Sequence, residues 1–593
     1  MKDKNQHAMK YALLVILGVT LYTTCQHPPS PNAKIYDDFV NDPIKSQLQD
    51  FSYAGYGYGE KTILEDRSLI NVNHFGIMPN TGEDLTIPVQ ALLDSIGQAG
   101  GGVVFFPKGR YAFNMDTSQV QFLTIDYDHI VIRGEGTDEN GTILYSGSNT
   151  VQLDESPWIS PFMIRTGYQI QGTKKMWGFK SRKIDQSALA EAKAKTNQDG
   201  TIYEAEAIAS FAKEAKKGDT VIYLDQTIDV RPGDFLLLGM YNTSEDGNLI
   251  KDLLSPMDSF ESYMGAALQA GPEQAASYQV LVEVKAADAE NRIELVQPLR
   301  RDMPMIYEPV VAMAPMLTGI GIENVRFESG WDGEFCHHGC EDSDKRESRI
   351  MDYGWNAINM ARVAHGWVKN VCIKNFTNAI YLQDSRNVTI SEVTLRGYNG
   401  HAGIKLYGHS EDNLIENITI NTHFRHILSG EGNGYGNVFR YVTYELKDED
   451  GDGEAQIDFH GFSDRFFSPM GYNLFENIKG IHAIRGSGAQ HNLPNASRGN
   501  VFWNIEASPT GQYAEIIQYY KNYKEGKEIK SDHYKYYPGS IVVGFYGEGK
   551  QFVIEGSPAD RTDEGVYVES LNTGKVQPES LYQAQLEYRL KQR

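Results

Sequence analysis

The sequence predicts an all-β protein, a right-handed parallel β-helix solenoid with an N-terminal capping helix and a small inserted β-rich domain. Segments made of an isoleucine, an outward residue and an apolar residue recur every 22 to 30 residues, a period typical of solenoid coils. They start at Ile358, Ile380, Ile404, Ile427, Ile457 and Ile484. An asparagine opens many apolar strands, and stacked amides can bond between coils about 4.8 Å apart. These asparagines are Asn370, Asn387, Asn413, Asn437, Asn473 and Asn500.

The composition fits one long repeat fold as well as several domains. The chain has 593 residues, of which 41% are hydrophobic, so a large core can form. Its formal net charge of −23 excludes general binding to nucleic acid or to anionic membranes. A local basic cleft can still hold an anionic ligand, because charges are screened beyond about 8–10 Å.

The amino terminus reads as an export signal. Lys2, Lys4 and Lys10 precede an apolar run, Tyr11 to Tyr22, which is too short to span a bilayer. Cys25 follows, and the segment resembles a bacterial lipoprotein signal in which this cysteine becomes the lipidated first residue. We expect an exported protein in the periplasm or at the cell surface, whose lipid anchor in the outer membrane is its only membrane contact. Plain secretion is the alternative.

Changes in composition divide the chain into six parts. These are a signal peptide (1–25), a linker (26–60), a cap with the first coils (61–183), an inserted α+β domain (184–302), a central β-helix (303–510), and the last coils with a C-terminal cap (511–593). Helices are expected at 88–99, within 187–217 and at 579–591. The insert either walls one end of a groove or serves as a module without a role in the site.

The segment around the first expected helix resembles a known family. Val72–Gly76, Gly82–Thr86 and Gly100–Tyr111 surround the amphipathic helix and are similar to the N-terminal signature of the pectate-lyase-like right-handed parallel β-helix superfamily. The resemblance covers about forty residues and implies a helix-capped coil. The whole chain looks like secreted enzymes for acidic, ulvan-like polysaccharides. Because that superfamily hosts lyases, hydrolases, epimerases and phage proteins, its fold alone does not fix the chemistry.

Alternation along the strands predicts one polar face. If the six isoleucines point inward, aromatic, imidazole and cationic side chains gather outward beside small residues, as in a ligand cleft. The rung that starts at Ile427 then presents Leu428 and Gly430 outward. The expected catalytic residues are Lys405, Arg485, His460 and Tyr407, and the expected substrate-binding residues are Tyr381, Gln383, His401, His426 and Asp458. An ordinary solvated face is the alternative.

These side chains suit β-elimination on a uronic acid, by a polysaccharide lyase or by a dehydratase acting at the non-reducing end. The reaction needs a base for the C5 proton, a cation for the carboxylate and an acid for the C4 oxygen. Arg485 is the expected carboxylate clamp. Lys405 is the expected base, provided that burial and nearby positive charge favour its neutral form. Tyr407 or His460 donates the proton.

Two other functions remain open. A glycoside hydrolase needs two carboxyl groups about 5–9.5 Å apart, which Asp458 could supply with Asp384, Glu431 or Asp464. A non-catalytic glycan-binding lipoprotein is favoured if Lys405 and Arg485 prove buried or far apart. In each case the partner is an acidic oligo- or polysaccharide.

A cofactor is not required, although two segments hint at metals. Asp448, Asp450 and Asp452 resemble the first half of a calcium loop, but Phe459 stands where its bidentate glutamate is expected. Cys336 and Cys340 flank two histidines without a second pair at zinc-ligand spacing, which favours a local disulfide or buried thiols.

Overall fold

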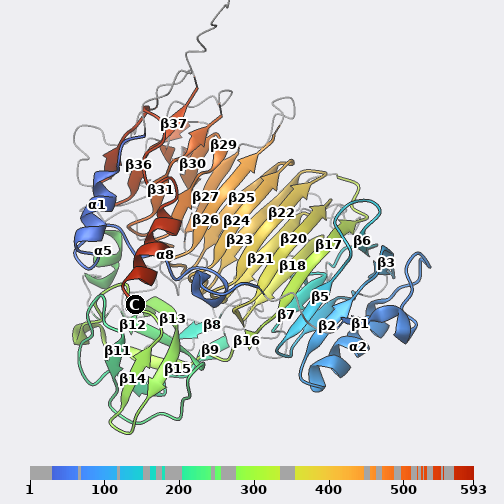
Figure 1. Cartoon of the computed structure of the whole chain (residues 1–593), viewed down its shortest axis with the longest axis horizontal. Coiled ribbons are helices and arrows are strands. Elements are labelled where there is room, and N and C mark those ends of the chain that lie inside the picture. The colour runs from blue at the N-terminus through green and yellow to red at the C-terminus, as the bar shows by residue number, and fades with distance from the viewer. Residues whose placement is uncertain are drawn as a thin grey trace, which may run out of the picture.

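A computed structural model of the chain shows a parallel β-helix (Figure 1). It describes residues 30–63, 69–116, 120–150, 160–167, 177–179, 203–241, 243, 248–255, 276–333, 354–446, 455–461, 470–486, 496–508, 517–518, 522–524, 527–529, 539–548, 552 and 566–593. Cys25, Cys336, Cys340, Asp464 and the expected calcium loop therefore lie outside the described residues. Within the described residues no helix is long and apolar enough to cross a membrane.

Two parallel sheets form the walls of the solenoid. The nine-stranded sheet contains β4 (Leu123–Ile125), β7 (Ile164–Thr166), β18 (Asn356–Ala361), β21 (Asn378–Gln383), β23 (Gly400–Tyr407), β25 (Phe424–Glu431), β27 (Gln456–Gly461), β30 (Ala483–Gly486) and β33 (Ile517–Gln518). The seventeen-stranded sheet contains β1 (Leu69–Asn71), β2 (Gly102–Phe105), β3 (Gly109–Phe113), β5 (Ile130–Arg133), β6 (Thr142–Ser146), β17 (Gly321–Ser329), β20 (Trp367–Lys374), β22 (Thr389–Arg396), β24 (Leu414–Ile420), β26 (Val438–Tyr444), β28 (Leu474–Glu476), β29 (Lys479–Ile481), β31 (Val501–Trp503), β32 (Glu506–Ala507), β36 (Ile541–Val543), β37 (Tyr546–Gly547) and β38 (Tyr567–Glu569).

The long strands of the seventeen-stranded sheet each bend at one residue with positive φ. These residues are Asn324, Asn370, Glu392, Asn417 and Tyr441, with φ between 50° and 56°. Asparagine tolerates this left-handed conformation better than most residues, which explains why it occupies three of the five bends. The bend gives each coil a first limb before this residue and a second limb after it. With the nine-stranded sheet, the coil therefore has three walls.

A ladder of asparagine side chains runs along one corner, as the sequence predicts. The Nδ2 group of Asn413 donates to Asn437 at 2.9 Å, and that of Asn437 donates to Asn473 at 2.9 Å. Asn473 continues the ladder to Asn500 at 3.2 Å. Asn370 does not belong to it, because it lies at a bend, where it donates to Asn324 instead.

Helices cover the N-terminal end and one wall of the solenoid. Helix α2 (Thr86–Gln98) buries Val89, Leu92 and Leu93 against the first coils, beside η2 (Val72–Phe75). Helix α8 (Leu581–Lys591) starts at Ser580, whose side chain accepts the backbone N–H of Gln583. With α1 (Lys34–Asn41) and η1 (Tyr56–Gly59), α8 lies along the outside of the first limb, which leaves the other two walls to carry sites.

A separate antiparallel sheet lies beside the solenoid (Figure 1). Its six strands are β10 (Ala209–Ser210), β11 (Val221–Tyr223), β12 (Phe235–Tyr241), β13 (Ala276–Ala287), β14 (Arg292–Leu295) and β15 (Val310–Met313). Helix α5 (Asn248–Leu254), η4 (Met305–Tyr307) and the pairs β8 (Trp177–Phe179) with β9 (Tyr203–Ala205), β16 (Leu317–Thr318) with β19 (Val363–Ala364) and β34 (Asn522–Lys524) with β35 (Lys527–Ile529) complete the described elements.

The helix expected within 187–217 is wrong over its described part. Residues 203–217 contain β9, β10 and irregular chain. Ala209 and Phe211 are buried in the core of the six-stranded sheet, and β10 pairs with β15. Burial in this sheet overrides the helical propensity of the alanines and lysines.

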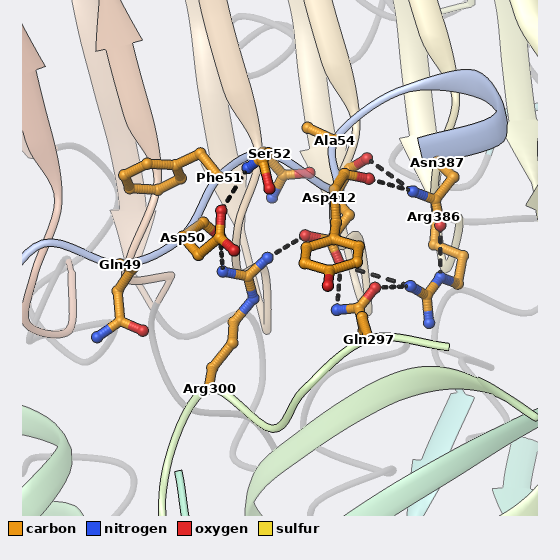
Figure 2. Close-up of polar contacts among 12 residues, drawn as sticks. Gln49, Asp50, Phe51, Ser52, Ala54, Gln297, Arg300, Arg386, Asn387 and Asp412 are labelled. Carbon is orange, nitrogen blue, oxygen red and sulfur yellow. Dashed lines mark hydrogen bonds and ion pairs between the residues drawn. The ribbon is translucent and has the colours of Figure 1, made fainter. Parts of the chain in front are cut away.

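A buried charge network fixes the six-stranded sheet to the solenoid (Figure 2). The carboxylate of Asp412 pairs with Arg300, and Arg386 lies 3.5 Å away on its other side. Gln297 donates to Asp412 at 2.7 Å and accepts from Arg386. Arg300 also donates to the backbone oxygen of Asp50 at 2.7 Å. One carboxylate thus connects the insert, the N-terminal segment and the coils.

Asp412 and Glu411 are adjacent, but replacing each carboxylate with an amide is expected to change the free energy of unfolding by different amounts. Asp412→Asn leaves two buried guanidinium groups short of a counter-charge, so we expect a loss of about 3 kcal/mol in the free energy of unfolding. Burial raises the pKa of Glu411 well above its usual range because desolvation disfavours its ionised form, whereas Asp412 is paired with a guanidinium group. Glu411→Gln should therefore change stability little. Urea denaturation of both variants tests this, and equal losses would contradict it.

Candidate functional site

Polar side chains from successive coils form a row on the outward face of the nine-stranded sheet. The residues paired across it are Arg165, Asn359, Tyr381, Lys405, Ser429, Asp458 and Arg485. A second row, two residues further along each strand, contains Ala361, Gln383, Tyr407 and Glu431. The inward residues between the rows include Met360, Leu382 and Leu406, all at most 1% exposed. The predicted alternation is therefore confirmed for these coils.

One coil is shifted by one residue from the sequence prediction. Leu428, not Ile427, pairs with Ile404, so Ser429 and Glu431 take the outward positions expected for Leu428 and Gly430. Both Ile427 and Leu428 are fully buried, so hydrophobicity does not distinguish the two registers. A shift of one residue exchanges the faces of a strand. It brings a carboxylate, Glu431, onto the face.

In the later coils, the structure describes only the backbone of two expected catalytic residues, Arg485 and His460. Arg485 pairs with Asp458, as predicted, three strands away from Lys405. The pairing of β25 with β27 shifts after Gly430, so Gly461 rather than His460 lies opposite Glu431. The expectation that His460 shares the row of Tyr407 is wrong. The side chains of Arg485 and His460 lie outside the described part of the structure.

Lys405 lies at the centre of the face, and its ammonium group pairs with the carboxylate of Glu431. Its Nζ atom is 5.7 Å from the ring centre of Tyr381 and 5.6 Å from that of Tyr407. The charged group that Lys405 contacts is thus a carboxylate, whereas the role of base called for positive charge nearby. The geometry suits a fixed cation between two phenol rings.

His426 and Asp458 form a second pair on the next strands. The Nδ1 atom of His426 is 2.9 Å from Oδ2 of Asp458. Because a carboxylate oxygen accepts, Nδ1 carries the proton, and in the neutral ring Nε2 is the basic nitrogen. The ring of His401 lies 5.1 Å from that of His426. This arrangement orients an imidazole for proton transfer.

Amides and one further cation occupy the other end of the face. Asn359 donates to the side-chain oxygen of Gln383 at 3.0 Å, and the hydroxyl of Tyr381 donates to Asn378 at 3.1 Å. Arg165 faces Asn359 across β7 and β18. Sequence analysis missed Arg165, because almost two hundred residues separate its short strand from β18. Three apolar residues, Phe162 to Ile164, precede it without polar alternation, so the local sequence gives no signal.

The face is desolvated. Lys405, Asp458 and His426 are 7%, 0% and 6% exposed, and low solvent access strengthens ion pairs. No group of three or more metal-ligand side chains occurs among the described residues. Cys372 is the one free cysteine in this part of the chain, and it is buried on another wall.

Comparison with known proteins gives a family match for the C-terminal quarter. Residues 454–593 match a family described as a domain of unknown function (DUF4955). This segment contains Asp458 and Arg485. No curated protein matches the sequence significantly.

Several solved structures are similar to the chain at low identity. The tailspike protein gp49 from Pseudomonas phage LKA1 is 11% identical with a TM-score of 0.34, and the match covers 85% of this chain and 81% of that one. An exopolygalacturonase from Thermotoga maritima is 10% identical with a TM-score of 0.35, covering 88% and 86%. The A-module of mannuronan C-5 epimerase AlgE4 from Azotobacter vinelandii is 10% identical with a TM-score of 0.27, covering 86% and 96%. The assignment of the fold rests on the strand pairing rather than on these likenesses.

Removing only one partner of the Lys405–Glu431 pair should strongly lower the stability of the protein. Glu431→Leu leaves a buried ammonium group unpaired, and we expect a loss of about 3–5 kcal/mol in the free energy of unfolding. The double variant Lys405→Met/Glu431→Leu should recover most of it. The exposed pair Lys34–Asp38 is the control, where solvent screens the charges and the effect should be far smaller. The pair would not be coupled if, in urea denaturation, the double variant lost as much stability as the two single variants together.

Proposed function

We propose that the chain is a carbohydrate-active enzyme that performs β-elimination on uronic-acid-containing oligo- or polysaccharides. The substrate would lie along the outward face of the nine-stranded sheet. The observation that carries the proposal is the His426–Asp458 pair beside Lys405 and the two phenol rings. A base, a cation and candidate proton donors are the three groups that this reaction needs.

We assign these roles differently from the sequence prediction. His426, held by Asp458, takes the C5 proton on Nε2. Lys405, held in place by its contact with Glu431, stabilises the negative charge that develops on the uronate carboxyl group. As the C4–O bond breaks and the C4–C5 double bond forms, Tyr407 protonates the leaving oxygen. A sugar chain leaves in a lyase reaction, and water leaves in a dehydratase reaction.

A glycoside hydrolase is the second candidate, because Glu431 and Asp458 place two carboxyl groups on neighbouring strands. Hydrolysis requires one of the pair to be a protonated acid. Lys405 and His426 already occupy these two carboxylates. The carboxylate of Asp384 accepts the backbone N–H of His409 at 2.9 Å and so contributes to a turn. These contacts favour elimination over hydrolysis.

The burial of Lys405 is the observation that favours a non-catalytic glycan-binding protein. The oriented imidazole–carboxylate pair on the same face favours an enzyme, because binding alone needs no such pair. An activity assay separates these functions.

The assay is incubation with uronate-containing oligosaccharides, including sulfated algal ones. We expect an ultraviolet band from a conjugated unsaturated uronate. His426→Ala should lower turnover about 10²–10⁴-fold, as for loss of a general base. Gln90→Ala, on α2 at the capped end of the solenoid, should keep wild-type turnover. New reducing ends without the band would identify a hydrolase, and full activity in His426→Ala would contradict the assigned base.

We further propose that the protein is exported and anchored through a lipid on Cys25 in the outer membrane. The basic start, the short apolar run and the cysteine support this. Cells fed a labelled fatty acid should incorporate the label into the wild-type protein and not into Cys25→Ser. On cell fractionation, the wild-type protein should be found with the membrane, and Cys25→Ser should be found in another fraction. Equal labelling of both proteins would contradict the anchor.

A further inference from the structure

The outward face of the second limb carries a group of cations in an otherwise acidic protein. Arg326, Cys372 and Thr394 lie opposite one another on β17, β20 and β22. Two residues further along the same strands and on the same face are Glu328, Lys374 and Arg396. We call these six residues the second-limb cluster. It contains three cations and one carboxylate, whereas the whole chain has a net charge of −23.

Arg326 is the unusual member of the cluster. It is only 2% exposed, and its Nη2 atom pairs with Glu328 at 2.7 Å. Its Nε and Nη1 atoms are buried with no hydrogen-bond partner, and so is Nε of Arg396. A guanidinium group stays charged in proteins, and leaving its donors buried and unpaired is costly. Such donors in a native structure point to a bound water or ion.

The other members of the cluster do not supply the missing negative charge. Glu328 already serves two cations, because Lys374 lies 3.6 Å from its second oxygen. Burial raises the pKa of the Cys372 thiol, although Arg396 and Arg326 act in the opposite direction. The thiol is therefore neutral at pH 7 and adds no anion. The cluster keeps a surplus of positive charge around unpaired donors.

We propose that the second-limb cluster binds a small oxyanion, such as a sulfate or carboxylate group. Arg326 and Arg396 would donate to its oxygens through their unpaired nitrogens, since guanidinium groups bind oxyanions well. Arg110, which stacks on Tyr145 at 3.6 Å, adds positive charge at the edge of this face. The suggestion that the anion belongs to an acidic sugar rests on the proposed function, whereas the anion site itself does not.

Calorimetric titration of the whole protein with sodium sulfate, against sodium chloride at equal ionic strength, tests the site. We expect saturable binding of one sulfate per chain. Arg396→Gln, which changes a partly exposed residue, should weaken it at least about tenfold, a loss of about 1.4 kcal/mol. Arg326→Met should abolish it. Lys479→Gln is the matched control, since Lys479 lies on the second limb of a later coil and is 62% exposed.

The outcomes separate this proposal from the proposed function. His426→Ala should bind sulfate like the wild type, because the cluster lies on another wall. Absence of saturable binding in the wild type, or equal binding in Arg396→Gln, would overturn the anion site whatever the enzyme assay shows. Displacement of sulfate by sulfated or uronate oligosaccharides would support a sugar as the source. Binding of inorganic sulfate alone would support the site and overturn that source.

Discussion

The hydrogen-bond register between successive coils is the constraint on which the sites depend. Parallel pairing aligns each strand with the next, so one residue per coil repeats at the same place on the wall. The asparagine ladder holds this register at one corner, and residues with positive φ set the bend between the two limbs. A shift of one residue would turn Lys405 inward and bury its charge in the core. The sites are therefore consequences of stacking rather than of any local motif.

Burial decides what the charged groups on these walls can do. In the network around Asp412, one carboxylate is surrounded by guanidinium groups, while desolvation raises the pKa of its neighbour Glu411. On the nine-stranded sheet, Lys405 is paired with Glu431 and His426 with Asp458, which fixes the positions of these four groups. On the second limb the cations outnumber the carboxylates. The same fold thus presents a structural charge network, a polar face with paired charges and a face with surplus positive charge.

The sequence was sufficient to predict what repeats locally. The coil period, helices at 86–98 and 581–591, and the alternation around Ile358, Ile380 and Ile404 follow from patterns within one strand or helix. Two adjacent apolar residues, Ile427 and Leu428, concealed the shifted coil that brings Glu431 to Lys405. Arg165 and Arg326 belong to coils interrupted by long insertions, so their partners are set by tertiary pairing. The helix expected near residue 210 gave way to strand pairing for the same reason.

We propose that side chains from distant coils converge on the nine-stranded sheet to act on an acidic sugar. A crystal structure of the His426→Ala variant with a uronate oligosaccharide tests this most directly. We expect a uronate carboxyl group next to Lys405 and a C5 atom facing the space left by the imidazole. Sugar bound on a different wall, with this face unchanged, would contradict it.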